Sequence, residues 1–394
     1  MKKLRYPLMS NNITKNDLEQ VIKYLKKKNP ILTQSQNVEK FEIAWSKWLG
    51  VKYSVFVNSG SSANLITLST LKELYGFGEI IVPSLTWVSD VASVIQNGFT
   101  PVFVDINLNN LSMNEDLILD KINNNTKGVF ITYAQGFNAL SFKLLNKLKE
   151  LSIPLIEDVC ESHGANFQNK KLGTYGLMSN FSFYYAHHMS TIEGGMVCTN
   201  NKKIYQILRM FRSHGMVREI NDLKIKNRYI NQNKDLNEKF IFAYPAYNVR
   251  NTELNAIIGI NQLKFLDKNI KLRNQNHKIF LQNIDKKYFI TNFDLKGSSN
   301  YAFNLILKKA NKKNVIKLME GMNKAKIEYR RGSAGGGNQL RQPYLKKYIK
   351  KNLHLNFPVT EHIHFYGFYL GNYPSLTKNS IIKLCNIINK ILTS

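Results

Sequence analysis

Two adjacent histidines near the middle of the chain are the residues best suited to do chemistry. His187 and His188 lie in residues 182–195, which read SFYYAHHMSTIEGG. An imidazole gains and loses a proton near neutral pH, so it can act as a general acid or base. No lysine occurs between Gly173 and Asn201, so this segment has no primary amine that could bond covalently to a carbonyl group. The pattern therefore predicts proton transfer without a covalent lysine anchor.

A short segment rich in serine and glycine has the features of a phosphate-binding turn. Residues 59–64 read SGSSAN, and they lie between residues 54–58, which predict a strand, and residues 63–74, which predict a helix. A helix N-terminus offers free N–H groups to an anion, and Gly60 lets the backbone approach it closely. Ser61 adds a hydroxyl donor. The same residue types are common at helix N-caps, so an ordinary cap is the alternative.

In their order along the chain, these motifs resemble those of the vitamin B6-dependent sugar aminotransferases of the DegT/StrS family. In that family Ser-Phe is followed by a lysine five positions after the Ser, and then by Glu-Gly-Gly. Ser182 begins the same pattern here, and His187 stands at the lysine position. The matches run over residues 30–270 and, more weakly, to the end of the chain. The resemblance implies pyridoxal phosphate or pyridoxamine phosphate as cofactor, on an α/β fold of type I like that of aspartate aminotransferase.

Residues 156–165, IEDVCESHGA, resemble the family's block Glu-Asp-Ala-Ala-Gln-x-His-Gly. The resemblance implies that Asp158 pairs with the cofactor's ring nitrogen and keeps it protonated, which makes the ring an electron sink. It places Glu161, where the family more often has Gln, near the ring hydroxyl, and Trp87 against the ring face. A turn-capping Asp158, a core Trp87 and a packed structural His163 are the alternatives. The implied cofactor-binding set is Gly60, Ser61, Trp87, Asp158, Glu161, Ser182 and Asn248.

The motif YNVR, residues 247–250, resembles a family motif that acts across a subunit boundary. In relatives its Asn reaches the cofactor phosphate of the neighbouring subunit, so Asn248 implies a homodimer with shared active sites. The substrate is expected to contact Arg250 and also His214, for which a structural role is the alternative.

A histidine at the lysine position moves the expected reaction from amino transfer to elimination. The pattern resembles a His-bearing branch of the family that dehydrates nucleotide-linked sugars. The resemblance implies that glutamate converts the cofactor to its amine form, that this amine meets the sugar ketone, and that His187 moves a proton as the C3 hydroxyl leaves. The expected products are ammonia and a 3-deoxy-4-keto sugar. The expected substrate is GDP-4-keto-6-deoxy-D-mannose or a heptose analogue, for lipopolysaccharide or capsule biosynthesis.

Several alternatives remain open. His188 is a rival base, although the spacing to Glu193 favours His187. The chain could also be a nucleotide-sugar aminotransferase with an unusual base, or a cofactor-binding regulator without catalysis. A second His-bearing branch adds an iron–sulfur cluster, which needs four thiolates at suitable spacing. We expect no cluster and no other metal, because the chain has three scattered cysteines without CxxC spacing, Cys160, Cys198 and Cys385.

Residues 330–343, RRGSAGGGNQLRQP, resemble a substrate-side loop of both His-bearing branches. Arginines among glycines suit a diphosphate, because a guanidinium pairs with two phosphate oxygens at once. Arg330, Arg331 and Arg341 are therefore the expected ligands of a nucleotide diphosphate sugar. A mobile surface loop is the alternative.

The elements that would position these residues alternate between apolar strands and amphipathic helices. This order is typical of an α/β protein with a mostly parallel sheet and ligands at the carboxyl ends of its strands. We expect a large mixed sheet flanked by helices, with an N-terminal helical segment, over residues 1–255, and a smaller α+β domain over residues 256–394. One amphipathic helix over residues 254–266 would join them. Residues 221–240 are polar and rich in Lys and Asn, and they predict a long loop or excursion.

The composition limits the classes of partner. The 394 residues carry a formal net charge of +28, but the lysines are dispersed, so nucleic-acid binding is not expected. A basic surface would still favour an anionic, diphosphate-bearing substrate. No apolar run approaches the roughly 20 residues of a membrane helix, and no apolar segment follows the N-terminal lysines as in a signal peptide. The expected location is the cytoplasm, with no membrane partner.

Overall fold

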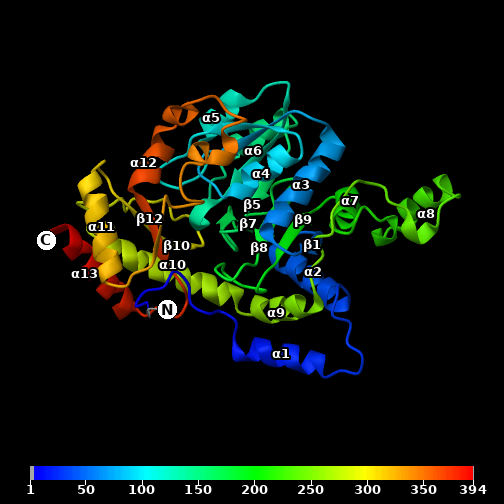
Figure 1. Ribbon diagram of the computed structural model, residues 1–394, viewed down its shortest axis with the longest axis horizontal. Coiled ribbons are helices and arrows are strands. Elements are labelled where there is room, and N and C mark those ends of the chain that lie inside the picture. Colours follow the sequence, from blue (N-terminus) through cyan, green and yellow to red (C-terminus); the bar gives the residue numbers. More distant parts are fainter. Residues whose placement is uncertain (1–3, 394) are drawn as a thin grey trace.

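The computed structural model describes residues 4–393, which form a large mixed sheet with helices on both faces and a smaller sheet beside it (Figure 1). Strand β9 is antiparallel to both of its neighbours, and the other pairs are parallel. The expected fold class is thereby confirmed. In order across the large sheet the strands are β1 (Tyr53–Val57), β9 (Gly195–Thr199), β8 (Met178–Ser182), β5 (Leu155–Asp158), β4 (Thr126–Thr132), β2 (Glu79–Pro83) and β3 (Thr100–Val104).

Two separate apolar cores lie on the two faces of the large sheet. Successive side chains of a strand point to opposite faces, so Val55 and Val57 join one core and Phe56 joins the other. The first core is covered by α3 (Gly60–Tyr75), α4 (Val88–Gln96) and α7 (Lys202–Arg212). The second is covered by α2 (Gln36–Leu49), α5 (Glu115–Lys121), α6 (Phe142–Glu150) and α9 (Glu253–Leu263).

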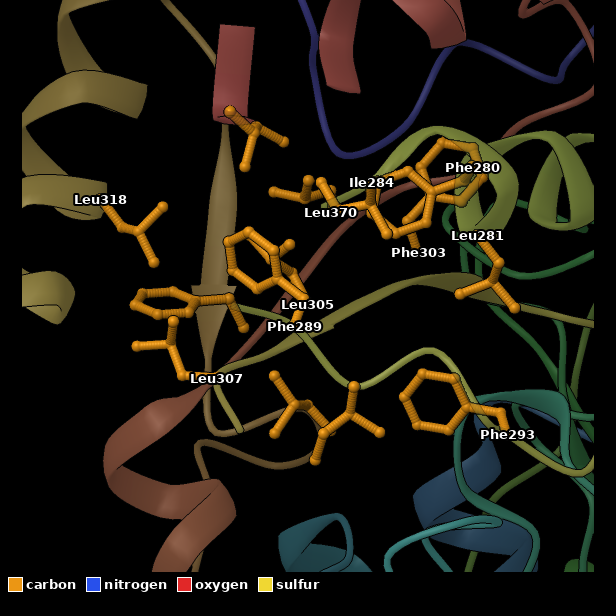
Figure 2. Close-up of a cluster of buried hydrophobic side chains, with 14 of the residues drawn as sticks. Phe280, Leu281, Ile284, Phe289, Phe293, Phe303, Leu305, Leu307, Leu318 and Leu370 are labelled. Carbon is orange, nitrogen blue, oxygen red and sulfur yellow. The ribbon is translucent and has the colours of Figure 1, made fainter. Parts of the chain in front are cut away.

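The smaller sheet is antiparallel and has its own core. Figure 2 shows Phe280 and Phe303 in this core, where their rings stack with centroids 4.6 Å apart and planes 7° apart. Its strands, in order, are β10 (Ala302–Ile306), β12 (Gly367–Gly371) and β11 (Tyr329–Arg331). The helices that contribute to this core are α10 (Leu266–Asn283), α11 (Lys312–Lys324), α12 (Pro358–Tyr366) and α13 (Lys378–Thr393).

The structure refines two expectations about the elements. The helix expected over residues 254–266 is present as α9, but it ends at Leu263, and a second helix, α10, follows from Leu266 beneath both parts of the molecule (Figure 1). The long loop or excursion expected over residues 221–240 contains a helix, α8 (Leu223–Gln232). Asp222 caps that helix by accepting hydrogen bonds from the N–H groups of Lys224 and Ile225, which favours helix over loop. The domain boundary after residue 255 falls inside α9 and stays a prediction.

The remaining elements belong to neither of the two larger sheets. They are the helix α1 (Lys15–Leu25), a hairpin of β6 (Asn166–Phe167) and β7 (Lys170–Lys171), and the 3₁₀ turns Ala134–Gly136, Val217–Glu219, Glu238–Phe240, Gln339–Arg341, Pro343–Leu345 and Leu353–Asn356. Within residues 4–393, no helix combines the length and the apolar character needed to cross a bilayer.

Candidate active site

A cavity of about 780 Å³ opens where the carboxyl ends of the parallel strands meet. The ends of β1, β2, β4, β5 and β8 each lead directly into residues that line it. Ligands of open α/β sheets bind at this edge, because the loops there differ in length and can carry polar groups. The lining residues at the last position of these strands or shortly after it are Ser59, Thr86, Thr132, Asp158 and Ser182.

The opposite walls come from distant parts of the chain. Residues 8–10 and Asn12 reach the cavity from the N-terminal segment, which is held against the small sheet. Tyr6 forms a parallel bridge with Ile327, and the N–H of Leu8 donates to a Glu328 carboxylate oxygen at 2.9 Å. The C-terminal contributors include Arg330, Arg331, Ala334, Gly335, Gly336, Tyr369 and Leu370.

The first turn of α3 forms a candidate phosphate cradle. Ser59 caps the helix by accepting from the N–H of Ser62 at 3.0 Å. Gly60 and Ser61 line the cavity, and the first N–H groups of a helix have no intrahelical partners. A Cβ on Gly60 would lie 2.6 Å from the Cβ of Ser182, so only glycine permits this approach of α3 to the end of β8. The residues fit a phosphate group.

Asp158 is placed to receive a protonated ring nitrogen. It is 4% exposed and borders the cavity. One carboxylate oxygen accepts from the N–H of Cys160 at 2.8 Å, and the other accepts from Asn64 Nδ2 at 3.2 Å. Its orientation is therefore fixed by two partners, as the proposed role requires.

A second carboxyl group, that of Asp90, lies behind Asp158, and sequence reasoning missed it. Asn64 Nδ2 also donates to Asp90 Oδ1, at 2.6 Å, so one amide bridges the two acids. Burial and the charge of Asp158 raise the pKa of Asp90 well above its ordinary value. The sequence did contain a pattern that could have identified Asp90. Asp90 and Val94 are four residues apart, so they share one face of α4, and a charged residue on an apolar helix face is unusual.

His187 lines the cavity with an uncharged ring. Burial first, and the charge of Arg273 second, lower its pKa to about 3. The expectation that this imidazole titrates near neutral pH is therefore wrong for the protein without ligands. A neutral imidazole has a free lone pair and is ready to accept a proton. Within residues 4–393, no lysine lines the cavity.

The other two histidines of the cluster are buried, although His188 also lines the cavity. His188 is 1% exposed, and its Nε2 lies 3.0 Å from the Ser299 carbonyl oxygen, so the neutral ring donates its proton there. His163 is fully buried, with its ring centroid 5.6 Å from those of Trp45 and Phe183. Burial lowers the pKa of both rings. These contacts favour His187 as the base.

Arg273 connects the large and small sheets beside the histidines. Its Nη1 donates to the carbonyl oxygens of Tyr301, at 2.8 Å, and Asn372, while Nη2 donates to the His187 carbonyl oxygen at 3.3 Å. The side chain is 5% exposed. Sequence reasoning missed this residue, because it lies in the middle of an ordinary polar helix pattern.

Glu161 and Trp87 border the cavity as expected. Glu161 accepts from the N–H of Gln135 at 2.8 Å, and burial raises its pKa to about 7. The indole of Trp87 is 56% exposed, so it is available to a flat ring and is not a core residue.

The structure separates the expected substrate residues into two groups. Arg330 and Arg331 line the cavity. Arg341 does not, and its guanidinium is paired with the Glu361 carboxylate through two hydrogen bonds. Three further expected residues also lie outside the lining of their own chain's cavity: His214, Asn248 and Arg250.

Comparison with known proteins places this geometry in a family context. The sequence pattern of the DegT/DnrJ/EryC1/StrS aminotransferase family matches residues 11–389. The chain is 34% identical over 377 residues to the GDP-4-keto-6-deoxy-D-mannose 3-dehydratase of Escherichia coli O55:H7, covering 94% of this chain and 96% of that protein. The enzyme of the same name from Yersinia pseudotuberculosis is 32% identical over 98% of this chain and 99% of its own length.

Solved structures agree over nearly the whole chain. The E. coli GDP-4-keto-6-deoxy-D-mannose 3-dehydratase with bound hydrated pyridoxal phosphate has a TM-score of 0.88 at 32% identity, covering 99% of each chain. A structure of GDP-4-keto-6-deoxymannose 3-dehydratase with a trapped pyridoxal phosphate–glutamate geminal diamine has a TM-score of 0.87 at 32% identity, covering 98% of this chain and 100% of that one.

Proposed function

Because the chain belongs to the DegT/DnrJ/EryC1/StrS aminotransferase family, we propose that it is a cofactor-dependent dehydratase that removes the C3 hydroxyl of a GDP-linked 4-keto-6-deoxy sugar. Two relatives that the chain matches over more than nine-tenths of its length carry this activity in their names. The observation that carries the proposal is a neutral imidazole, His187, at the family's lysine position, in a cavity that no lysine of the described chain lines.

The residues present fit pyridoxal phosphate and its amine form. The first turn of α3 suits the phosphate, Asp158 suits the ring nitrogen and Trp87 suits the ring face. When bound, the cofactor in its amine form, regenerated by glutamate, supplies a nitrogen for the sugar ketone and a ring that withdraws electrons. Asp158 strengthens this withdrawal by keeping the ring nitrogen protonated.

His187 performs the proton transfers in this proposal. Burial and Arg273 keep the ring neutral before the substrate arrives, so its free lone pair can accept a proton at the cavity wall. The resulting imidazolium is a strong acid in these surroundings, so it readily returns the proton to the departing C3 hydroxyl. Water leaves. Ammonia and the 3-deoxy-4-keto sugar would be released once water had cleaved both bonds of the nitrogen, to the cofactor and to the sugar, and glutamate would then convert the cofactor back to its amine form.

Arg330 and Arg331 are the proposed ligands of the substrate's diphosphate. Both line the cavity on the side opposite the strand ends. Arg331 Nη2 donates to the Phe365 carbonyl oxygen at 3.1 Å, which leaves further N–H donors of the guanidinium for phosphate oxygens. Arg341 is excluded from this role as long as it remains paired with Glu361.

The proposed assembly is a homodimer with shared sites. Asn248 and Arg250 lie outside the cavity of their own chain, so a role at the cofactor requires a second subunit. Exposed apolar side chains beside the cavity support an interface there, since Trp87, Tyr184 and Ile192 are 56%, 45% and 51% exposed. The product would serve the biosynthesis of a deoxysugar for a surface polysaccharide.

Product analysis tests the function. The protein is incubated with glutamate, pyridoxal phosphate and GDP-4-keto-6-deoxy-D-mannose, and ammonia and the sugar mass are measured. Dehydration releases ammonia and leaves a sugar that is lighter by one oxygen atom, because hydrogen replaces the C3 hydroxyl, whereas an aminotransferase leaves an amino group on the sugar. The matched control is His187→Asn, which keeps a polar side chain of similar reach but cannot move the proton. Retention of the amino group by the wild-type product would overturn the proposal.

A further inference from the structure

Two buried carboxyl groups share one amide at the floor of the cavity. Asn64 Nδ2 donates to Asp90 Oδ1 at 2.6 Å and to Asp158 Oδ2 at 3.2 Å. Asn64 is itself held, because its Oδ1 accepts from Asn180 Nδ2 at 2.9 Å, and Thr67 donates to Asn180 Oδ1 at 2.7 Å. Asp90 is 0% exposed and Asp158 is 4% exposed. Two ionised carboxylates that share one amide donor and are buried this deeply repel one another strongly.

No cation compensates for a second negative charge here. Within residues 4–393, no lysine, arginine or histidine forms a hydrogen bond or an ion pair with either carboxyl group. Three titratable groups interact electrostatically with Asp90, and all three are acids. They are Asp158, Cys160 and, from the C-terminal part, Tyr344. One proton therefore remains on the pair at neutral pH, as in other closely spaced carboxyl pairs.

The donors around the two groups decide which one keeps the proton. The Asn64 amide donates to both acids, and more closely to Asp90, but Asp158 alone receives a backbone N–H, that of Cys160, which favours an anion there. The other oxygen of Asp90 contacts two hydroxyls, those of Thr86 and Thr132, the latter at 2.7 Å. A hydroxyl can accept as well as donate, so either threonine can take the acid proton of Asp90. The two threonine oxygens are 2.9 Å apart, so the two hydroxyls also hydrogen-bond to one another.

We propose that Asp90 keeps its proton at neutral pH and acts as a positioning residue for Asp158, so that the pair carries one negative charge and presents it on Asp158 to the cofactor's ring nitrogen. The inference rests on the proposed function, in which Asp158 binds that nitrogen. The neutral acid and Asn64 fix the rotation of the Asp158 carboxylate without adding a second charge. Burial and the neighbouring charge, which raise the pKa of Asp90, agree with this assignment.

Infrared spectroscopy of the cofactor-free protein at pH 8 tests the proton directly. A protonated carboxyl group has a C=O stretching band that an ionised carboxylate lacks. We expect this band in the wild-type protein and its loss in Asp90→Asn, whose amide has the shape and donor pattern of a neutral acid. The matched control is Glu161→Gln, because Glu161 is another buried carboxyl group of the same cavity, with a pKa raised to about 7. A band that survives in Asp90→Asn, or one that is absent from the wild type, overturns the assignment.

Cofactor affinity tests the positioning role. Asp90→Leu removes the acceptor of Asn64, and we expect the Kd for pyridoxal phosphate to rise about tenfold, the effect of one lost hydrogen bond. Asp90→Asn should recover most of this loss. Equal weakening by both variants, or wild-type affinity in Asp90→Leu, overturns the role. The infrared result does not depend on the cofactor, so its failure leaves the dehydratase proposal standing. A wild-type protein that binds no pyridoxal phosphate would overturn both.

Discussion

Among single residues, His187 is neutral because of its surroundings, and not because of a hydrogen bond to its ring. Burial is the larger cause and the Arg273 guanidinium the smaller, and together they lower its pKa to about 3. The same guanidinium donates to the His187 carbonyl oxygen at 3.3 Å, so it also holds the backbone that carries the ring. A base that stays unprotonated across the physiological range is available to every incoming substrate.

The charge of Arg273 makes a testable contribution to this state. In Arg273→Met the protonated imidazole loses a repulsive neighbour, so we expect the pKa of His187 to rise but to stay below 6.5 because burial persists. NMR titration of the ring carbons, assigned with His187→Asn, measures the midpoint. Arg273→Lys is the matched control, since it retains the positive charge and should keep the midpoint low. An unchanged midpoint in Arg273→Met would show that the charge has no effect.

A lysine at position 187 should restore the covalent anchor and remove the elimination. We expect His187→Lys to bind pyridoxal phosphate through a linkage that borohydride makes permanent, and to lose dehydration, because an amine tends to recapture the cofactor. Mass spectrometry of the reduced protein detects the added cofactor. His187→Asn, which has no amine, should gain no such mass. Dehydration at the wild-type rate by His187→Lys would show that His187 is not the base.

Sequence spacing located His187 but could not give its protonation state. The position follows from a local pattern, the distance to Ser182 and to the Glu-Gly-Gly run. The pKa depends on Arg273, which is 86 residues away along the chain and meets His187 only in the folded protein. Asp90 was missed for a related reason, since its partners Asn64 and Thr132 lie in α3 and β4, far from it along the chain.

At the scale of elements, helix α12 is anchored by a side chain from another part of the fold. Asp105, just after β3, accepts from the N–H groups of Val359 and Thr360, both at 3.0 Å, and from the Thr360 hydroxyl at 2.7 Å. These are first-turn donors that lack intrahelical partners. The same helix carries Glu361, which binds Asn338 and Arg341 of the glycine-rich segment. Asp105 thus links the large sheet to one wall of the cavity.

Removal of this cap should cost stability. We expect Asp105→Ala to lower the free energy of unfolding by about 2 kcal/mol, because a helix loses its N-terminal acceptor and buried N–H groups lose their partner. Urea denaturation followed by circular dichroism measures the change. Asp120→Ala is the control, since that side chain is 69% exposed and should change stability by less than about 0.5 kcal/mol. A loss in Asp105→Ala no larger than the control's would contradict the anchoring role.

The elements could be predicted where a regular pattern determined them. The alternation of apolar strands with helices gave the fold class, and the Ser/Gly turn gave the start of α3 within three residues. The helix α8 was missed because its polar composition hides a weak apolar face, with Ile225, Tyr229 and Ile230 packed against the core. The break between α9 and α10 was missed because no Pro or Gly marks it.

At the scale of the whole molecule, the shared-site homodimer makes a complementation prediction. The His187→Asn and Asn248→Leu proteins should each be inactive or nearly so alone. In a mixed dimer one of the two sites combines an intact His187 with an intact Asn248, so mixing should restore activity after subunit exchange. Native mass spectrometry confirms the exchange, and two differently tagged His187→Asn proteins serve as the control. Exchange without recovery would contradict shared sites.

The wall formed by residues 8–12 also sets the order in which the chain can complete its site. Tyr6 and Leu8 are synthesised about three hundred residues before Ile327 and Glu328, which hold them. Until Ile327 and Glu328 are present, Tyr6 and Leu8 lack these partners, and contacts between such distant positions form slowly. A nascent chain that has already built its large sheet therefore still has an open, incomplete substrate compartment.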